Sequence, residues 1–354
     1  MTLAFPNLGK LSVLLSAYMR EVGGSFASPL PTTEKTVKLG VKYAPPDACL
    51  PMKVVLGNFL ESYENGADTA LFLGGRGPCS FGYFAEAFRL IFKQSGIKME
   101  VIAPEYDLSG IRDVKNMLRC ATKTSLKKQV FLIPEGIKCA GILDEYEQAL
   151  CDKRAELINN YKIKELEAFE EEINKKMQAS PSLTSLMQTA KNAIDEINCV
   201  KADRTPPLKI GIAGDIYTII DPFMNKNIQK LLGSMGAYTR CSMSISTWLR
   251  DKLKINGGNR ENAAADFLPH KIGGFAKETV ENAASWAKEG FDGIIELYPL
   301  NCMPESVARN ILPEVSKRYK KPVLSIVMDE QSAEAGFITR LEAFTQMIER
   351  RKNA

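Results

Sequence analysis

The chain has 354 residues, of which 45% are hydrophobic and 25% are charged, and its formal net charge is +4. This composition is typical of a folded, soluble protein and excludes long disordered or fibrous segments, while the small net charge predicts no binding to nucleic acid or to an anionic membrane. The single histidine, His270, excludes a multi-histidine metal site.

The first apolar stretch, from Leu11 to Met19, resembles the core of a signal peptide, but Lys10 and Arg20 flank it and its spacing also fits a helix. The sequence has no run of about eighteen apolar residues, the length that a membrane-spanning helix needs. We therefore expect a cytoplasmic protein without a membrane span.

Short apolar strands alternate with helical patterns in two parts of the chain. The strands predicted in the first part are 2–6, 24–29, 68–75, 98–105 and 129–135, with helices at 51–64, 81–94 and 111–121. The strands predicted in the second part are 208–213, 238–242, 293–297 and 323–328. This alternation is typical of parallel sheets with helices on both faces, so the predicted fold class is α/β with two doubly wound domains.

The two parts are separated by residues 143–198, which contain hardly any strand signal. Within them, the charge-rich segment 162–173 has helical spacing, which predicts a helical bridge. The segment Ala202–Pro207 reads as a linker. The predicted organisation is an N-terminal α/β domain at 1–142, a bridge and linker at 143–205, and a C-terminal α/β domain at 206–354.

Two segments share one pattern: Gly-x-Asp, an apolar strand, a turn, and a cysteine that opens a helix. In one of them Cys79 follows Asp68 by 11 positions, and in the other Cys302 follows Asp292 by 10. We expect the two domains to be distant copies of one plan. In open α/β sheets the carboxyl ends of the strands face the ligand crevice, so both cysteines are expected there.

Cys49 and Cys302 each stand two positions before a proline, in Cys-Leu-Pro and Cys-Met-Pro. Proline is favoured in the first helical turn, so both thiols are expected at helix N-termini, where the helix dipole and free N–H groups stabilise a thiolate. The glycine-rich loop 74–77, just before Cys79, would allow close approach of the backbone to an anionic group.

The eight cysteines include no Cys-x-x-Cys pair. Three thiolates without histidine suit an iron–sulfur cluster with one iron left for another ligand, and a cysteine-rich zinc site is the alternative. The cysteines at 120, 151 and 199 lie in helical patterns and are interpreted as structural, whereas the roles of Cys139 and Cys241 stay open. The chain lacks a phosphate loop and a complete dinucleotide fingerprint, so no nucleotide site is assigned.

Several segments resemble the family of 2-hydroxyacyl-CoA dehydratase-like proteins, also described as CoA-substrate-specific enzyme activase-related iron–sulfur proteins. The segments run in order over most of the chain and are 49–53 (CLPMK), 77–83 (GPCSFGY), 221–223 (DPF), 302–305 (CMPE), and 329–331 (DEQ) through 339–344 (TRLEAF). The resemblance implies two Rossmann-like domains with a [4Fe–4S] cluster held by three cysteines, here Cys49, Cys79 and Cys302. It also admits a double-cubane cluster, which would need more thiolates, with Cys139 and Cys241 in reserve.

The resemblance further implies the function. We expect a low-potential reductase or dehydratase-like component of an anaerobic metabolism that receives electrons from a separate ATP-hydrolysing activase. A small molecule or an acyl-CoA thioester would be the substrate, and a homo- or heterodimer is expected. The alternative functions are a non-catalytic cluster-binding or electron-transfer scaffold and, third, a structural zinc protein.

Overall fold

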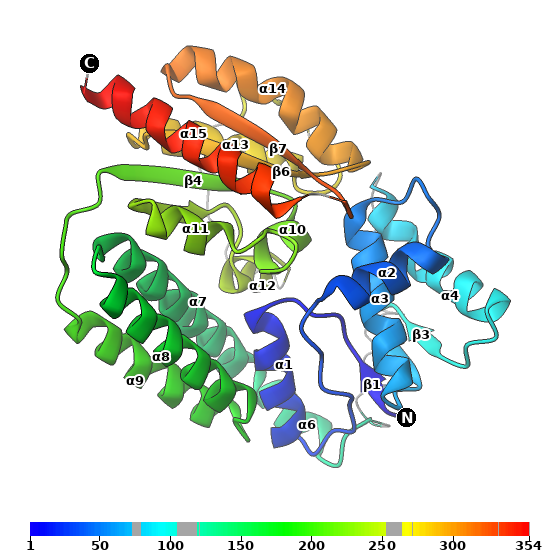
Figure 1. Cartoon of the computed structure of the whole chain (residues 1–354). Coiled ribbons are helices and arrows are strands. Elements are labelled where there is room, and N and C mark those ends of the chain that lie inside the picture. Colours follow the sequence, from blue (N-terminus) through cyan, green and yellow to red (C-terminus); the bar gives the residue numbers. More distant parts are fainter. Residues whose placement is uncertain are drawn as a thin grey trace. The chain divides into compact units, whose positions relative to one another are not determined.

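The computed structural model describes residues 1–72, 79–104, 119, 121–252, 264–270, 272–331 and 333–353. The chain forms two compact units. Unit 1 consists of Met1–Cys139 and Gln178–Leu186, and unit 2 consists of Ala140–Met177 and Met187–Ala354. The described residues form a mixed α/β structure with one parallel sheet in each unit (Figure 1).

The sheet of unit 1 has the order β1-β2-β3, with all neighbours parallel. Its strands are β1 (Leu3–Ala4), β2 (Thr69–Leu71) and β3 (Glu100–Ile102). The helical elements of this unit are α1 (Lys10–Glu21), α2 (Glu34–Tyr43), α3 (Leu50–Glu64), the short 3-10 helix η1 (Ser80–Tyr83), α4 (Phe84–Gln94) and α6 (Leu126–Phe131).

Helix α3 is the centre of unit 1, because every residue from Leu50 to Ser62 is buried. Helix α2 packs against it at very short range. A Cβ atom placed on Gly40 would lie 1.7 Å from a backbone oxygen of α3, and one placed on Gly57 would lie 2.0 Å from a backbone oxygen of α2. Only glycine permits this approach at either position. The close packing fixes α3, which carries Cys49 at its N-terminus.

The sheet of unit 2 has the order β5-β4-β6-β7 and is also parallel. Its strands are β4 (Leu208–Gly214), β5 (Ala237–Cys241), β6 (Gly293–Pro299) and β7 (Val323–Met328). Its helices after the first strand are α10 (Ile216–Ile220), α11 (Ile228–Ser234), α12 (Ile245–Lys252), α13 (Ala276–Lys288), α14 (Met303–Tyr319) and α15 (Glu334–Asn353).

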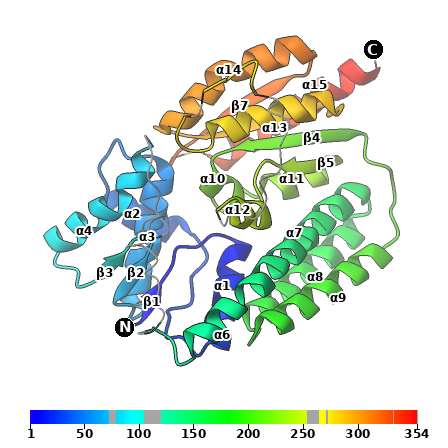
Figure 2. The same ribbon diagram turned by 180° about the vertical axis from the view of Figure 1, so that it is seen from behind.

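Helices cover both faces of this sheet, as the two opposite views show (Figure 1, Figure 2). On one face, Ile294 of β6 packs in a core with α13 and α14. On the other face, Gly293 lies against Phe344 and Ile348 of α15. Strand β6 is buried at all seven positions, which explains its almost uninterrupted apolar sequence.

Three helices occupy the region of the predicted bridge: α7 (Ile133–Glu156), α8 (Asn160–Gln178) and α9 (Leu183–Cys199). Arg154 Nη2 of α7 bonds to Glu170 Oε2 of α8 at 2.7 Å. The Arg204 Nε atom, in the segment that leads to β4, donates to the carbonyl oxygen of Ala155 at 2.9 Å. These contacts attach most of α7 and α8 to unit 2.

Most predicted strands are confirmed: 2–6, 208–213, 238–242, 293–297 and 323–328 contain strands, as do the described parts of 68–75 and 98–105. Two predictions are wrong. Residues 24–29 contribute a single bridge, Leu3 to Phe26. Residues 129–135 form α6 and the start of α7, because Ser125 caps α6 by accepting the Lys128 N–H, at 3.4 Å. The loop 74–77 and nearly all of the predicted helix 111–121 lie outside the described residues.

Within the described parts of the chain, no helix combines the length and the apolar character that a membrane crossing requires.

Candidate functional site

Two helices end in the same way, each just before an inner strand of its sheet. Gly66 follows α3 with a φ of 88°, and Gly290 follows α13 with a φ of 87°. After each glycine, the next N–H donates to a carbonyl oxygen five residues earlier, at 3.0 Å in both units. This is the Schellman arrangement, in which a residue in the left-handed region closes the helix and glycine is preferred.

The aspartates of the two Gly-x-Asp segments have the same role. Asp68 Oδ1 accepts the N–H of Thr2 at 2.7 Å, and Asp292 Oδ2 accepts the N–H of Lys209 at 2.9 Å. In each unit the aspartate N–H donates back to the carbonyl oxygen of that same neighbour. The predicted similarity of the two segments is therefore confirmed at these turns. In each unit the aspartate aligns the strand that follows it with a neighbouring strand: β2 with β1, and β6 with β4.

All three predicted ligand residues occupy the N-cap of a helical element. Cys49 caps α3, Cys302 caps α14, and each cap is followed by a proline in the first turn. Cys79 caps η1, which leads directly into α4. Cys49 and Cys302 are each 8% exposed, and Cys79 is partly exposed. The first N–H groups of a helix have no partner within it, so they can donate to a thiolate or to a sulfide nearby.

A buried cation lies near Cys49. Lys53, one turn further along α3, is 4% exposed, and its Nζ donates to the carbonyl oxygen of Pro46 at 3.1 Å. This places the ammonium group against the loop that leads into Cys49. A positive charge beside a cysteine favours the thiolate form, which binds metal.

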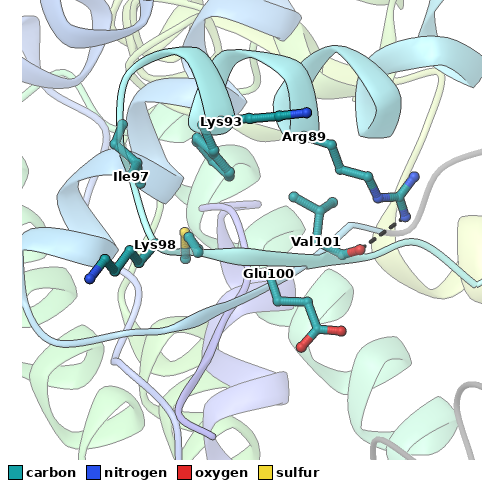
Figure 3. A pocket seen from close by; sticks show the side chains of 8 residues that line it. Arg89, Lys93, Ile97, Lys98, Glu100 and Val101 are labelled. Atoms are coloured by element: carbon teal, nitrogen blue, oxygen red, sulfur yellow. Dashed lines mark hydrogen bonds between the residues drawn. The ribbon is translucent and has the colours of Figure 1, made fainter.

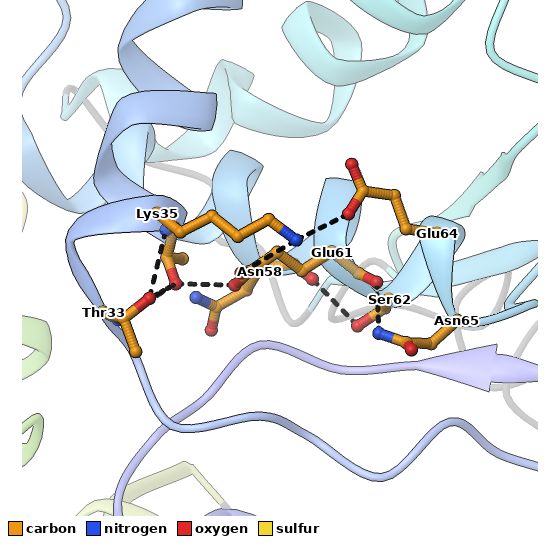
Figure 4. Close-up of polar contacts among 8 residues, drawn as sticks. Thr33, Lys35, Asn58, Glu61, Ser62, Glu64 and Asn65 are labelled. Atoms are coloured by element: carbon orange, nitrogen blue, oxygen red, sulfur yellow. Dashed lines mark hydrogen bonds and ion pairs between the residues drawn. The ribbon is translucent and has the colours of Figure 1, made fainter.

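A polar network holds the other end of α3 (Figure 4). Thr33 and Thr36 form a capping box at the start of α2. The Thr36 hydroxyl donates to Glu61 Oε2 of α3 at 2.6 Å, and Lys35 Nζ pairs with Glu64 at 2.8 Å. The network therefore attaches α2 to α3 and keeps α3, with Cys49, in a fixed position.

Cys302 lies in a turn that is fixed on both sides. Its N–H donates to the carbonyl oxygen of Pro299 at 3.0 Å, and its own carbonyl oxygen accepts the Ser306 hydroxyl at 2.8 Å. The Ser306 hydroxyl is also 3.1 Å from the hydroxyl of Tyr298. Leu300 and Met303 are 41% and 46% exposed, so apolar surface flanks the turn.

Cys302 follows β6 at a switch in the topology of the sheet. Strands β4 and β6 are neighbours, but the chain continues from β4 to β5 on one side and from β6 to β7 on the other. Ligands of open α/β sheets bind outside the carboxyl ends of such strands. At this point β4 and β6 approach each other closely. A Cβ atom placed on Gly214, the last residue of β4, would lie 2.1 Å from the backbone oxygen of Leu297 in β6, so the position requires glycine.

Three carboxyl groups near this switch were not identified as site residues from the sequence. Glu296 of β6 and Glu305 of α14 are both fully buried, and Asp215 caps α10 directly after β4. Burial raises the pKa of Glu296 to about 7 and that of Asp215 to about 6, and it raises the pKa of Glu305 well above its ordinary value. The sequence contains one indication of these buried carboxyl groups: the acidic residue Glu296 interrupts the otherwise apolar sequence of β6.

Of the two cysteines held in reserve, Cys139 is buried and Cys241 is partly exposed. Cys139 lies inside α7, and burial raises its pKa to about 12, while burial raises the pKa of Cys241, at the end of β5, far above its ordinary value. Cys151 is also buried, with a pKa raised to about 12, whereas Cys199 is exposed. The described cysteines are all free thiols, and Cys120 lies outside the described residues.

Unit 1 also contains a pocket of about 570 Å³ between α4 and β3 (Figure 3). Arg89, Lys93 and Lys98 contribute positive charge around an apolar floor that includes Phe92 and Val101. Arg89 already donates to the carbonyl oxygen of Val101 at 2.9 Å and pairs with a glutamate of its own helix. None of the three predicted ligand residues lines this pocket.

The predicted ligands are divided between the units: Cys49 and Cys79 belong to unit 1, and Cys302 belongs to unit 2. Within either unit, the described residues contain no group of three or more His, Cys, Asp or Glu side chains placed to hold a metal ion. The donor set itself, three cysteines at helix N-termini, has the chemistry that an iron–sulfur cluster requires.

The sequence matches no protein-family model, and a comparison with curated proteins gives no match either.

Proposed function

We propose that this chain is an iron–sulfur protein in which Cys49, Cys79 and Cys302 ligate a [4Fe–4S] cluster. It would act as the low-potential reductase or dehydratase-like component that receives electrons from a separate ATP-hydrolysing activase. The observation that supports this proposal best is that each of the three cysteines caps the N-terminus of a helical element. The segments that resemble the 2-hydroxyacyl-CoA dehydratase-like family support it independently.

In this proposal the cluster supplies one-electron redox chemistry, with one iron left for a non-cysteine ligand or substrate. The chain's own residues hold and tune it. Helix N–H groups would donate to sulfur, Lys53 would contribute positive charge near Cys49, and Ser306 would fix the turn of Cys302. Each unit would be a doubly wound Rossmann-like domain, which is supported in unit 2 by the helices on both faces of the sheet.

The family resemblance also supports the remaining parts of the proposal. The substrate would be an acyl-CoA thioester or another small reducible molecule, and the protein would form a homo- or heterodimer. The proposed compartment is the cytoplasm, where a reducing environment keeps thiols free, and the described cysteines form no disulfide.

The test is anaerobic purification followed by quantitation of iron, sulfide and zinc, with a visible spectrum before and after dithionite. We expect a brown protein that reductant bleaches. Cys49→Ser, Cys79→Ser and Cys302→Ser should each lose most of the iron and sulfide, whereas Cys199→Ser, which changes an exposed thiol, should retain them. Full iron and sulfide in Cys302→Ser, or a colourless protein that contains zinc, would overturn the proposal.

A second measurement distinguishes the enzyme from an electron-transfer scaffold. The reduced protein is mixed with acyl-CoA thioesters or other small reducible compounds, and its reoxidation is followed by absorbance. Reoxidation by a small molecule supports the reductase or dehydratase. Reoxidation by protein partners alone would instead favour the scaffold.

A further inference from the structure

Glu296 is a fully buried acidic residue in β6, one of the two inner strands of the sheet in unit 2. In the parallel register it lies between Ala213 of β4 and Ser325 of β7. Alternate residues of a strand face the same side, and Ile294 packs against α13 and α14, so Glu296 also faces those helices. Among the described residues, no group meets the geometry of a hydrogen bond to either of its carboxyl oxygens. The Ser325 hydroxyl nevertheless offsets part of the rise in pKa that burial causes.

Glu305 is a second fully buried carboxyl group on the same side of the sheet. It is the third residue of α14, and the Thr279 hydroxyl of α13 lies 3.1 and 3.3 Å from its two oxygens. A neutral hydroxyl does not balance the charge of a carboxylate. Glu296 and Glu305 also repel each other when both are ionised, because Glu296 contributes to the raised pKa of Glu305.

Burial favours protons on both carboxyl groups, and for Glu305 the neighbouring acidic groups add to this effect. Among the described residues, the titratable and charged groups that act on the pair are Asp215 after β4, Glu278 on α13 and Arg309 on α14. Strand β7 has no titratable residue, and the titratable side chain of α10 is Tyr217. The two acidic groups oppose ionisation of Glu305, and the exposed Arg309 is a weak counter-charge for Glu296. A buried carboxyl group in such surroundings takes up a proton rather than remain charged.

The pair flanks the turn that carries Cys302 along the chain. Glu296 comes six positions before this cysteine along the chain, and Glu305 comes three positions after it. Tyr298, on the same face of β6 as Glu296, is linked through Ser306 to the carbonyl oxygen of Cys302. Cys302 is 8% exposed and Glu296 is fully buried, so a change in charge at Cys302 would act on Glu296 with little screening by water.

We propose that Glu296 and Glu305 form a buried proton-holding site, and that Glu296 takes up one proton when the cluster ligated by Cys302 gains one electron. This inference rests on the function proposed above. The electron comes from a one-electron donor protein and reduces the cluster, while an O–H bond forms on the Glu296 carboxylate with a proton from water. Both are released on reoxidation. The two events are thermodynamically linked. The free energy by which the bound proton favours reduction of the cluster equals the free energy by which the electron favours protonation of Glu296.

The first test uses the chain without a cluster. Infrared spectroscopy should show a protonated carboxyl band that titrates near pH 7 and is absent in Glu296→Gln. Glu314→Gln, which changes an exposed glutamate of α14, should retain the band. A wild-type protein without such a band would overturn the proton-holding site. If Glu296→Gln does not fold, Ser325→Ala tests the same group, because removing this hydroxyl, which lowers the pKa of Glu296, should raise the pH at which the band disappears.

The second test uses the reconstituted protein. Above about pH 7 the midpoint potential should fall with pH, by up to about 59 mV for each tenfold change in proton activity in a one-electron couple. In Glu296→Gln it should be independent of pH over this range. A flat profile in a wild type that holds its cluster would overturn the coupling and leave the proposed function intact. A chain that binds no cluster would overturn both, while the infrared band still decides the carboxyl site.

Discussion

Replacing Glu296 by glutamine is expected to stabilise unit 2 in alkaline solution and to have much less effect in mild acid. Burial raises the pKa of this carboxyl group from 4.5 to about 7. The folded state therefore binds the proton more tightly than the unfolded state does. As a result, Glu296 lowers the stability progressively as the pH rises from about 4.5 to about 7, and its full cost is present above pH 7.

The size of the effect follows from the two pKa values. Each pKa unit corresponds to about 1.4 kcal/mol, so the difference between 4.5 and about 7 gives a total of about 3 kcal/mol. Part of this cost is already present at pH 5. Between pH 5 and pH 8, the stability of Glu296→Gln relative to the wild type should therefore increase by about 2 to 3 kcal/mol. Glutamine keeps the shape of the side chain, so its own packing contributes equally at both pH values.

Urea unfolding followed by tryptophan fluorescence measures this difference. Both tryptophans, Trp248 and Trp286, belong to unit 2, so the signal reports on that unit. Glu314→Gln is the control, because this glutamate lies exposed on α14 and should show no such pH dependence. The difference in the free energy of unfolding between Glu296→Gln and the wild type could instead change by less than about 0.5 kcal/mol between pH 5 and pH 8. In that case the pKa of Glu296 is not raised in the folded protein.

Three further predictions concern packing and the cysteines. Gly40→Ala places a methyl group 1.7 Å from a backbone oxygen of α3, so it should lower the free energy of unfolding in urea by about 1–3 kcal/mol. The control Gly336→Ala, at an open helical position, should be neutral or slightly stabilising. Equal effects of the two substitutions would contradict the close packing of α2 and α3. Alkylation of the folded, cluster-free protein at pH 7, followed by mass spectrometry, should modify the exposed Cys199 quickly and Cys241 much more slowly, because Cys241 is only partly exposed and its pKa is raised. Equally fast labelling of Cys241 would contradict that raised pKa. Ser306→Ala removes one hydrogen bond to the Cys302 turn and should cost about 1 kcal/mol; unchanged stability would show that the turn is held by other contacts.

The sheet of unit 2 was predictable because its strands are buried on both faces and so have nearly continuous apolar sequences between turn residues. The segment 129–135 has a similar composition, yet it is helical. There the cap at Ser125 decides the local structure, and Val130, Phe131 and Ile133 remain exposed rather than entering a sheet. An apolar run of this length does not distinguish a strand from a helix by periodicity alone.

The positions of the cysteines were predictable for a different reason. A proline two residues after Cys49 and after Cys302 indicates the start of a helix, and both are N-caps. The buried carboxyl pair was not predictable in this way. The two carboxyl groups lie on the same side of the sheet because of the register of β6 and the docking of α14, which are tertiary features that spacing along the chain does not contain.

The repeated plan of the two units bears on the number of ligands in the proposed cluster. In both units a helix, a Gly-x-Asp turn, a central strand and an N-cap cysteine follow one another, so Cys79 and Cys302 are counterparts. Cys49 caps the helix before the turn in unit 1, and the residue in the equivalent position of unit 2, the N-cap of α13, is Phe275. A strict copy would have supplied four cysteines. The phenylalanine leaves three, and in the proposed cubane cluster this number would keep one iron open to a substrate or another ligand.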